Sequence, residues 1–462
     1  MSPTFPTAIL AAWVVFSAGL FGRLDARKAA LIALIGGWAL LPTGDYPPEV
    51  LAAGHERSGP THAVALPAPP WFNKATAIGL GCLVGSVLFD WANLRRLRPR
   101  WSDAPAALWL LAPIATAAAN GRPVVEGLIQ ARYLALTWGV PYLLGRASFA
   151  DAEALRMFAR AWVVAGLVTL PMGLVEFVAG PSWYHAVYGG HPYRFDGSDR
   201  WVGHRPLGFL EHGNQFGTWA ATAAVAAAWL WATGDARAWR AGRLPIPGGV
   251  VVAGLVGSAV LWQSHGSILL MGLALAPLVP LGRWGRRGRW AVAVVAATLA
   301  LAAGAWAARG GIAGLRDQAR AVFHGIGKAS FTWRFARLAE NVPRLVERPM
   351  LGWGRADWSG LTPDGTFTDP IALSLFFLVA GMYGGLGLVA LAGLLLTPIG
   401  AASRSRPRAD SPPIVLAAVL LALNVADLAL NGGFLLPMLL AAGGINGCLL
   451  GREATPPGLQ RG

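Results

Sequence analysis

The chain has 462 residues, of which 55% are hydrophobic and only 13% are charged, and its formal net charge is +15. Soluble globular proteins carry roughly 25% charged residues, so this chain could not cover the surface of a soluble fold of its size. A lipid bilayer accepts apolar side chains but offers the backbone no partners, so the apolar segments are expected to form helices. The composition therefore predicts an all-α fold, a polytopic transmembrane helical bundle.

Apolar runs recur along the whole chain and predict about 12–13 membrane spans, although several are shorter than the ~20 residues that a span usually needs. The weakest of them is 29–42. The first run has no basic segment ahead of it, which predicts a retained span and not a cleaved signal peptide. In chain order, the runs cover residues 7–22, 29–42, 72–91, 104–119, 127–144, 157–179, 215–233, 248–262, 267–282, 290–308, 371–398, 413–430 and 434–450.

Basic residues cluster in every second connection between these runs, as the positive-inside rule predicts for cytoplasmic loops. The clusters contain Arg23, Arg27 and Lys28, then Arg95, Arg96, Arg98 and Arg100, then Arg146 and Arg156, then Arg237, Arg240 and Arg243, then Arg283, Arg286, Arg287 and Arg289, and finally Arg404, Arg406 and Arg408. The N-terminus is then outside and the C-terminus cytoplasmic. The outer face carries the connections 43–71, 120–126, 180–214, 263–266 and 309–370.

The positive charge does not indicate a nucleic-acid partner, because most of the Lys and Arg residues are accounted for as topology determinants and no segment resembles an RNA- or DNA-binding module. The two cysteines, Cys82 and Cys448, both lie in apolar runs. Neither a disulfide nor a metal pair is therefore expected from them. We predict no nucleic-acid partner, no metal and no cofactor.

The chain is expected to divide by membrane topology. Only two outer loops are long and rich in polar and aromatic residues, and loops of that length are usually functional or disordered. No internal repeat is evident, so the inverted-repeat signature of many secondary transporters is not found. The parts are N-terminal transmembrane helices (1–179), a first outer loop (180–214), central transmembrane helices (215–308), a long, partly helical periplasmic loop (309–370), C-terminal transmembrane helices (371–450) and a cytoplasmic tail (451–462).

Within the long outer loop, residues 331–348 have the periodicity of an amphipathic helix, which Pro343 would bend or end early. Such a helix would lie on lipid with its arginines at headgroup phosphates. Some of the same arginines could instead hold a lipid-linked phosphate substrate, and the two interpretations are compatible. One side carries Phe331, Phe335, Leu338, Val342 and Leu345, and the other carries Arg334, Arg337, Asn341, Arg344 and Arg348.

Two polar segments lie at predicted outer membrane boundaries. Polar side chains there are costly unless they face a cavity or a partner. The first segment, Tyr193 to Gly217, is interpreted either as a helix-capping cluster or as a helix end that faces substrate. The second is the turn Gln263–Ser267, whose His265 is either a packing residue or a part of the site. The polar residues of the first segment at the boundary are Arg205, Glu211, His212, Asn214 and Gln215.

The order of these features resembles the O-antigen ligase and polymerase superfamily of membrane glycosyltransferases. Arg205-Pro-Leu-Gly-Phe-Leu-Glu-His-Gly-Asn214 resembles the family's Arg-x-x-Gly-x-x-x-x-x-Asn element before a span. Gln263-Ser264-His265-Gly266-Ser267 resembles its Ser-Arg-Gly turn. Arg334 or Arg337, followed by Arg348-Pro349-Met350-Leu351-Gly352-Trp353-Gly354, resembles its Pro-x-x-Gly-x-Gly segment. The resemblance covers about 180–390, including the span that begins after Asp369-Pro370.

The resemblance implies roles for these residues. Arg205 and one of Arg334 or Arg337 would bind the diphosphate of the donor, and His265 would be a secondary phosphate or acceptor contact. Asp369 would be the catalytic base. The sequence departs from the family pattern where the turn has His265 instead of Arg, and where the long loop ends in Thr368-Asp369-Pro370 instead of His-Asn. Further candidates at the site are Glu211, His212, Asn214 and Arg348, and no metal is implied.

The chemistry of glycosyl transfer explains this choice of residues. A lipid diphosphate is already a good leaving group, so the protein must hold developing negative charge, which Arg does bidentately while staying protonated. The acceptor hydroxyl needs a nearby base. We therefore expect a metal-independent inverting glycosyltransferase of the bacterial inner membrane that polymerises or ligates polyprenyl-diphosphate-linked glycan at the outer face. Its partners would be that donor, a glycan or lipid acceptor, membrane lipids and polysaccharide assembly proteins.

Two functions from other classes remain open. A transporter or flippase for lipid-linked glycan would use the same basic outer surface without chemistry. It would show paired broken helices and ionisable residues in mid-span, whereas Glu126, Arg132, Glu176 and Asp427 lie near span ends or alone. A non-catalytic component of a polysaccharide export complex would keep the fold and lack the activity.

Overall fold

The computed structural model describes residues 4–43, 72–188, 198–276, 342–354, 358, 374–405, 411–429, 431 and 433–449. Helices make up most of this part of the chain, which confirms the all-α prediction. The only strands in these ranges are β1 (Ala238–Ala241) and β2 (Leu244–Pro247), which pair as an antiparallel hairpin. This hairpin is not predicted from the sequence, where the basic cluster around Arg240 indicates only a connecting loop.

The helices of the first 188 residues follow the predicted apolar runs. The run 29–42 is helical, because α2, a π-helical turn (Ile32–Gly36) and α3 continue into one another. A second π-helical turn (Ala135–Gly139) joins α9 to α10 in the same way. The helices are α1 (Thr4–Arg23), α2 (Ala26–Leu31), α3 (Gly37–Leu40), α6 (Lys74–Phe89), α7 (Trp91–Arg95), α8 (Ala104–Ala119), α9 (Val124–Leu134), α10 (Val140–Ser148), α11 (Ala152–Ala179) and α12 (Trp183–Tyr188).

The second half of the described chain contains α13 (Gly213–Ala232), α14 (Gly248–Leu261), α15 (His265–Leu275), α20 (Leu375–Arg404), α21 (Ser411–Leu428) and α22 (Met438–Leu449). Residues 342–347 are helical and belong to the predicted amphipathic helix, whose remaining part, 331–341, lies outside the described residues. The predicted run 290–308 also lies outside them.

Side-chain caps set where two of the helices begin. Asn73 accepts a hydrogen bond from Thr76 N at 3.1 Å while its own N–H donates to Thr76 Oγ1 at 2.8 Å, which closes a capping box at the start of α6. The Asp151 carboxylate accepts from Ala154 N at 2.9 Å at the start of α11. Both caps satisfy N–H groups that have no partner within the helix.

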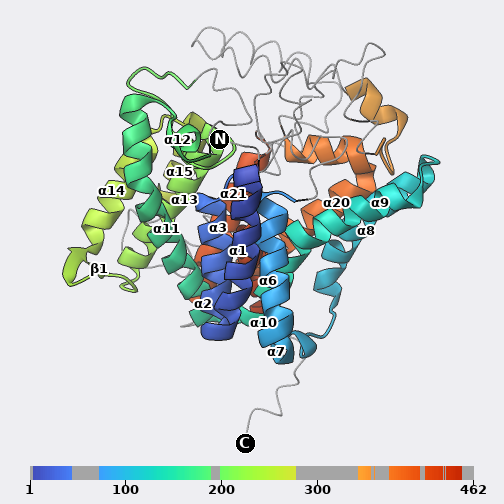
Figure 1. The fold of residues 1–462 in the computed structure, drawn as a ribbon, viewed down its shortest axis with the longest axis horizontal. Coiled ribbons are helices and arrows are strands. Elements are labelled where there is room, and N and C mark those ends of the chain that lie inside the picture. Colours follow the sequence, from blue (N-terminus) through green and yellow to red (C-terminus); the bar gives the residue numbers. More distant parts are fainter. Residues whose placement is uncertain are drawn as a thin grey trace, which may run out of the picture.

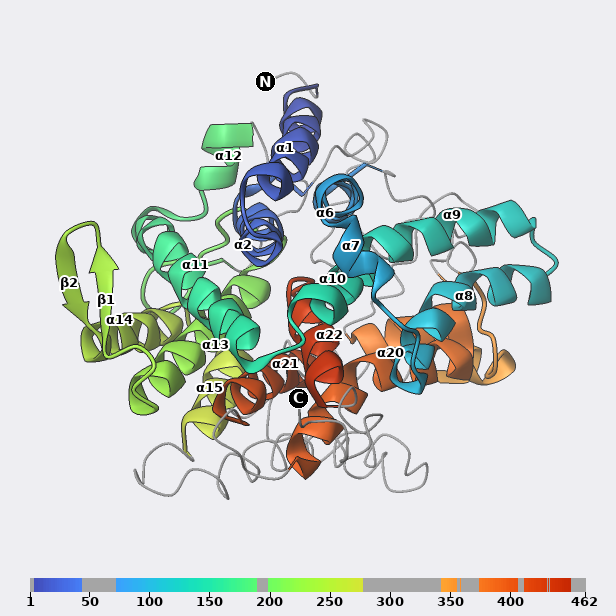
Figure 2. The ribbon, with the colours of Figure 1, turned by 90° about the horizontal axis from the view of Figure 1, so that it is seen from below.

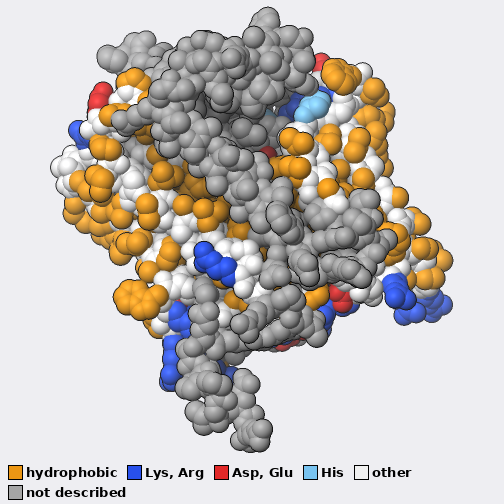
Figure 3. All heavy atoms as spheres, turned by 180° about the vertical axis from the view of Figure 1, so that it is seen from behind, with side chains coloured by type: hydrophobic (Ala, Val, Ile, Leu, Met, Phe, Trp, Pro, Cys, Tyr) orange, Lys and Arg blue, Asp and Glu red, His pale blue; other side chains and the backbone are white. Residues whose placement is uncertain are grey.

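Three of the described helices are long and apolar enough to cross a membrane, namely Phe5–Arg23, Ala152–Ala179 and Leu375–Arg404. Large apolar side chains on all three are exposed, for example Val15 (74%), Val178 (78%) and Val389 (67%). In Figure 3, hydrophobic side chains are spread over the described surface, and most of the Lys and Arg side chains gather in its lower half. A monomeric soluble protein rarely exposes apolar surface on this scale, so the chain associates with a membrane.

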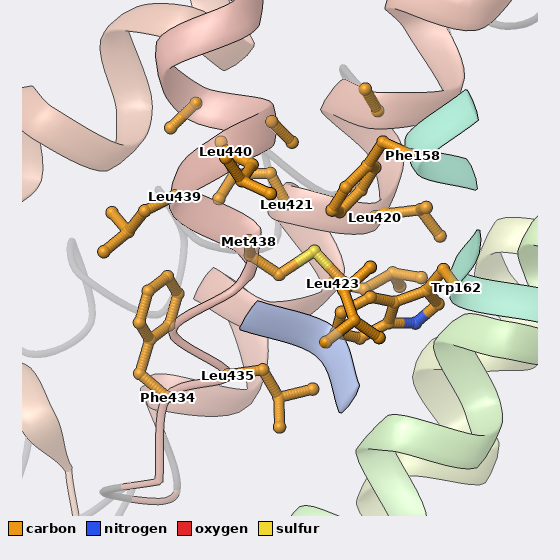
Figure 4. Close-up of a cluster of buried hydrophobic side chains, with 14 of the residues drawn as sticks. Phe158, Trp162, Leu420, Leu421, Leu423, Phe434, Leu435, Met438, Leu439 and Leu440 are labelled. Carbon is orange, nitrogen blue, oxygen red and sulfur yellow. The ribbon is translucent and has the colours of Figure 1, made fainter. Parts of the chain in front are cut away.

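The core of the bundle is formed by α21 and α22. Seen from below in Figure 2, these helices lie in the middle of the molecule, with α10, α11, α13 and α20 around them. Figure 4 shows the apolar contact between Phe158 and Trp162 of α11, Leu420 of α21 and Met438 of α22. All four are fully buried. Close packing of these apolar side chains joins the three helices.

Ion pairs gather at the end of the bundle that is lowest in Figure 1, where α2, α7 and α10 lie. Arg146, which is nearly fully buried, donates to Asp103 Oδ1 at 2.8 Å and to Oδ2 at 3.1 Å. Burial acts to raise the pKa of Asp103, but the hydrogen bonds from Arg146 and Tyr142 outweigh it and leave the pKa below its ordinary value. Arg27 pairs with Asp151 and Arg156 with Asp235 at the same end. These contacts join the connections that carry the predicted cytoplasmic basic clusters.

Helix α20 is broken at Gly384, whose φ is 61°. The segment 349–354 lies against the break and bonds to it through the backbone, with Gly385 N donating to Pro349 O at 2.7 Å and Trp353 N donating to Gly381 O at 2.9 Å. A Cβ at position 384 would lie 2.4 Å from the carbonyl carbon of Met350. Gly384 is therefore required both by its backbone angle and by this close approach.

Gly384→Ala is expected to destabilise the protein by about 3 kcal/mol, since it adds left-handed strain to a clash with backbone that cannot move aside. The measurement is thermal unfolding of the purified protein in detergent. Gly400→Ala on the same helix is the control, because nothing lies within 4 Å of a Cβ there. Alanine is the better helix former, so the control should unfold at or above the wild-type temperature. Equal unfolding temperatures for the two variants would contradict the role given to the break.

Candidate functional site

The segment that leads into α13 is held by a single buried carboxylate. Glu176, near the end of α11, is 0% exposed. Its Oε2 accepts from the backbone N–H groups of Leu207 and Gly208, both at 2.7 Å. Its Oε1 accepts from Ser182 N at 2.9 Å and Trp183 N at 3.0 Å. Four charge-assisted bonds thus fix the loop after α11 and the loop before α13 to one side chain.

A chain of side-chain hydrogen bonds runs from Arg205 to α21. The Nη1 of Arg205 donates to Asn214 Oδ1 at 2.8 Å, and Asn214 Nδ2 donates to Asn431 Oδ1 at 3.1 Å. Asn431 Nδ2 in turn donates to Asp427 Oδ1 at 2.7 Å. The aliphatic stem of Arg205 crosses Gly213, where a Cβ would lie 2.3 Å from Arg205 Cδ. A bond to a neutral amide orients the guanidinium without cancelling its charge.

Lys74, at the start of α6, reaches the same segment from another helix. It is 2% exposed, and its Nζ donates to Phe209 O at 2.9 Å and lies 5.2 Å from the centre of the Trp38 ring. The half-buried carboxylate of Glu211 lies close enough to interact with the Lys74 charge. A cation at a helix N-terminus is opposed by the helix dipole. Its compensation here comes from the carbonyl, the aromatic ring and Glu211.

The turn Gln263–Ser267 packs against the first turns of α13. Ser264 Oγ and Ser267 Oγ are 3.0 Å apart, and Ser267 Oγ is 2.9 Å from Thr218 Oγ1. Thr218 also donates to the carbonyl of Asn214 at 3.1 Å. His265, the first residue of α15, is exposed and its ring lies 5.9 Å from that of Trp201. The two predicted motifs, 205–214 and 263–267, are therefore neighbours.

No protein-family model matches this chain, and a search of curated proteins finds no match either. The assignment of the site therefore depends on its geometry and on the sequence pattern.

Arg348 is placed apart from this cluster. Its guanidinium lies 4.3 Å from the centre of the Trp353 ring, and Arg344 stacks on the same ring at 5.0 Å. Thr116 Oγ1 donates to Leu351 O at 2.7 Å and Asn120 Nδ2 to Gly352 O at 3.0 Å, so the segment is fixed to the end of α8. In Figure 1, this segment is at the upper right, whereas α12, α13 and α15 are at the left of centre.

The structure thus brings together some of the predicted site residues. Arg205, Glu211, His212 and Asn214 lie in one cluster, and His265 lies on the turn beside it. The Nδ1 of His212 accepts from Asn214 N at 3.0 Å, so His212 caps α13. Three predicted residues, Arg334, Arg337 and Asp369, lie outside the described residues. Within the ranges that are described, no group of three or more His, Cys, Asp or Glu side chains could hold a metal ion.

Three residues of the cluster are not predicted as site residues from the sequence, namely Lys74, Asp427 and Asn431. Lys74 has a local signal, because it is a cation at the first position of an apolar helix. Asp427 is in the last turn of α21, and Asn431 follows the end of that helix and donates its backbone N–H to the carbonyl of Asp427 at 2.8 Å. The contact of Asn431 with Asn214 joins segments 217 residues apart in the chain, and no local pattern predicts it.

The cluster combines a cation, amides that orient it and a carboxylate near a second cation. Arg205 has the geometry and permanent charge to bind a phosphate oxygen pair. Glu211, His212, Asp427 and the exposed His265 are among the groups of the cluster and its neighbouring turn that could accept or donate a proton. An anionic substrate and a proton transfer are the chemistry that this arrangement supports.

Proposed function

We propose that the chain is a multi-pass glycosyltransferase of a bacterial inner membrane, which polymerises or ligates polyprenyl-diphosphate-linked glycan at the outer face. The observation that carries the proposal is the bond from Arg205 to Asn214, with the turn of His265 packed against the same helix. It supports a diphosphate site at the N-terminal end of α13, where the sequence resembles the donor-binding element of O-antigen ligases and polymerases. One of Arg334 or Arg337 would complete the diphosphate contacts.

The arrangement of polar contacts supports the topology in this proposal. About 12–13 spans are proposed from the apolar runs, with the N-terminus outside and the C-terminus in the cytoplasm. Arg205, Lys74, Glu176 and Asn431 are at helix ends that the charge pattern puts on the outer side. The ion pairs of Arg27, Arg146 and Arg156 connect helix ends that it puts on the inner side. The site would then meet donor lipid in the outer leaflet.

In the proposed reaction, the guanidinium of Arg205 binds diphosphate oxygens and holds the negative charge that develops as the glycosyl bond breaks. The bond to Asn214, supported in turn by Asn431, fixes the direction of the guanidinium before substrate arrives. Such preorganisation is where most of the electrostatic contribution to catalysis comes from. The acceptor hydroxyl attacks from the opposite face, and a base takes its proton.

The direct test uses the purified full chain in liposomes. Labelled undecaprenyl-diphosphate-linked glycan, isolated from the cells that make this protein, is supplied with and without unlabelled acceptor glycan from the same cells. A glycosidic product that is longer than the donor, together with released undecaprenyl diphosphate, is the expected result. A complete absence of product from folded protein with both substrates would overturn the proposal.

A transporter of lipid-linked glycan is the second candidate, because the break in α20 at Gly384 is a feature of helices that line transport pathways. The same liposomes distinguish the two functions. A transporter would move labelled donor between the leaflets and make no product. A non-catalytic component of an export complex would do neither on its own.

A further inference from the structure

Glu211 is a carboxylate of the cluster that has no role in the diphosphate site described above. It precedes His212, the N-cap of α13, and its backbone N–H donates to Gln215 Oε1 at 3.2 Å. Glu211 as a whole is half-buried, and no hydrogen bond joins its carboxylate to another described residue. In Glu176, by contrast, both carboxylate oxygens accept hydrogen bonds from backbone N–H groups. Glu211 therefore has free acceptor capacity within the segment that joins Arg205 to Asn214.

The charged and titratable side chains near Glu211 come from more than one element, and each of them is bonded to a partner other than the Glu211 carboxylate. Lys74 faces it from α6, while the Nζ of Lys74 is bonded to Phe209 O. Arg205, in the same segment, donates to Asn214, and the ring of His212 accepts from the backbone of Asn214. The carboxylate of Glu211 thus interacts with the charge of Lys74 but forms no hydrogen bond with it.

We propose that Glu211 is the general base that takes the proton of the acceptor hydroxyl, and that Lys74 is a positioning residue that holds the Glu211 segment through its bond to the carbonyl of Phe209. This inference rests on the proposed glycosyl transfer. It assigns to a residue of the segment that leads into α13 the role that the family resemblance gives to Asp369.

The step balances as follows. The acceptor oxygen forms a bond to the anomeric carbon of the donor sugar, and the bond from that carbon to the diphosphate oxygen breaks. The leaving electron pair stays on polyprenyl diphosphate, whose charge Arg205 holds. The hydroxyl proton passes to the Glu211 carboxylate and is then released to water. Neither a metal nor a redox partner is required.

The protonation behaviour of Glu211 suits this role. Burial raises the pKa of its carboxyl to about 7, and the charge of Lys74 acts in the opposite direction. A base is most effective when its pKa is near the working pH, because it is then both ionised and strong enough to accept a proton. The catalytic rate should therefore rise with pH through the neutral range as Glu211 ionises.

The test measures kcat and the donor KM of the full chain in liposomes between pH 5.5 and 9, with the labelled undecaprenyl-diphosphate-linked glycan as the probe. Glu211→Gln should lower kcat ~100-fold or more, which is the contribution of a general base, and leave the donor KM within about threefold. Glu211→Asp should recover part of kcat, because it keeps a carboxylate. Asp369→Asn should have a much smaller effect on kcat than Glu211→Gln.

Lys74→Met gives a readout that a purely structural role would not move. Removing the cation raises the pKa of Glu211 further, so the pH at half-maximal kcat should shift upward. Glu153→Gln is the control, because Glu153 is in the first turn of α11, at the other end of that helix from Glu176. This variant should keep the wild-type dependence of kcat on pH. Folding of each variant is checked by comparing its elution volume with that of the wild-type protein in size-exclusion chromatography in detergent.

The possible outcomes separate the two proposals. Wild-type product together with a near-normal kcat for Glu211→Gln, or an unshifted pH profile for active Lys74→Met, would overturn the role of Glu211 and leave the proposed function standing. A larger loss in Asp369→Asn than in Glu211→Gln would likewise return the role of base to Asp369. No product from the wild-type protein would overturn the proposed function, and this inference with it.

Discussion

Replacing Arg205 by alanine is expected to lower the rate of product formation ~100- to 1,000-fold, the loss seen when one preorganised donor to a developing anion is removed. The reason is that the guanidinium carries a permanent charge that Asn214 aims in advance. The same substitution should weaken donor binding, since ground-state diphosphate contacts are lost as well. The liposome assay gives kcat and KM, and the chain-length distribution of surface glycan gives the effect in cells.

Arg205→Lys separates the charge of the side chain from its geometry. Lysine keeps the positive charge but lacks the planar fork that binds two oxygens and reaches Asn214, so an intermediate loss is expected. Arg240→Ala is the control, because it removes the same charge from the exposed β1–β2 hairpin at the other end of the molecule. If Arg205→Ala were folded and retained a rate within about threefold of the control, Arg205 would not be the diphosphate ligand.

Much of the helical architecture follows from hydropathy, because an apolar run that enters lipid must satisfy its own backbone and therefore favours a helix. The run 104–119 coincides with α8, and 248–262 differs from α14 by one residue. The β1–β2 hairpin and the break at Gly384 do not follow from hydropathy. Both depend on backbone pairing, and the partner of Gly385 is Pro349, far upstream in the chain. An apolar run that contains Gly-Gly looks the same whether it is continuous or broken.

The site is predictable only in its local parts. Arg205 and Asn214 are recognised because they share one short motif with the entry to α13. Lys74 is not predicted as a partner of Phe209, because that contact joins the start of α6 to the loop before α13 through the tertiary fold. The same holds for Glu176, which the sequence presents as an isolated carboxylate near the end of a span. Arg205 and Asn214 are close together in the sequence, whereas the partners of Lys74 and Glu176 are brought to them only by the tertiary fold. The sequence therefore does not show which donors surround a buried carboxylate such as Glu176.

Glu176→Gln is expected to destabilise the protein by about 3 kcal/mol or more, although the two side chains have nearly the same shape. The amide oxygen can keep two of the four backbone bonds. The amide NH₂ then faces the N–H groups of the other two residues, either Leu207 and Gly208 or Ser182 and Trp183. Two buried donors are left facing a third donor, and the loss of each bond to a charge adds to the cost.

The measurement is thermal unfolding in detergent, with Glu153→Gln of the same helix as the matched control. Glu153 is a largely exposed carboxylate paired with Arg156, so its neutralisation should cost little. A variant of Glu176 that still folds should also lose activity, because Leu207 and Gly208 follow Arg205 directly in the chain and their N–H groups fix its position. Wild-type stability in Glu176→Gln would show that the loop before α13 is held by its buried apolar residues, Leu207, Phe209 and Leu210, and not by this carboxylate.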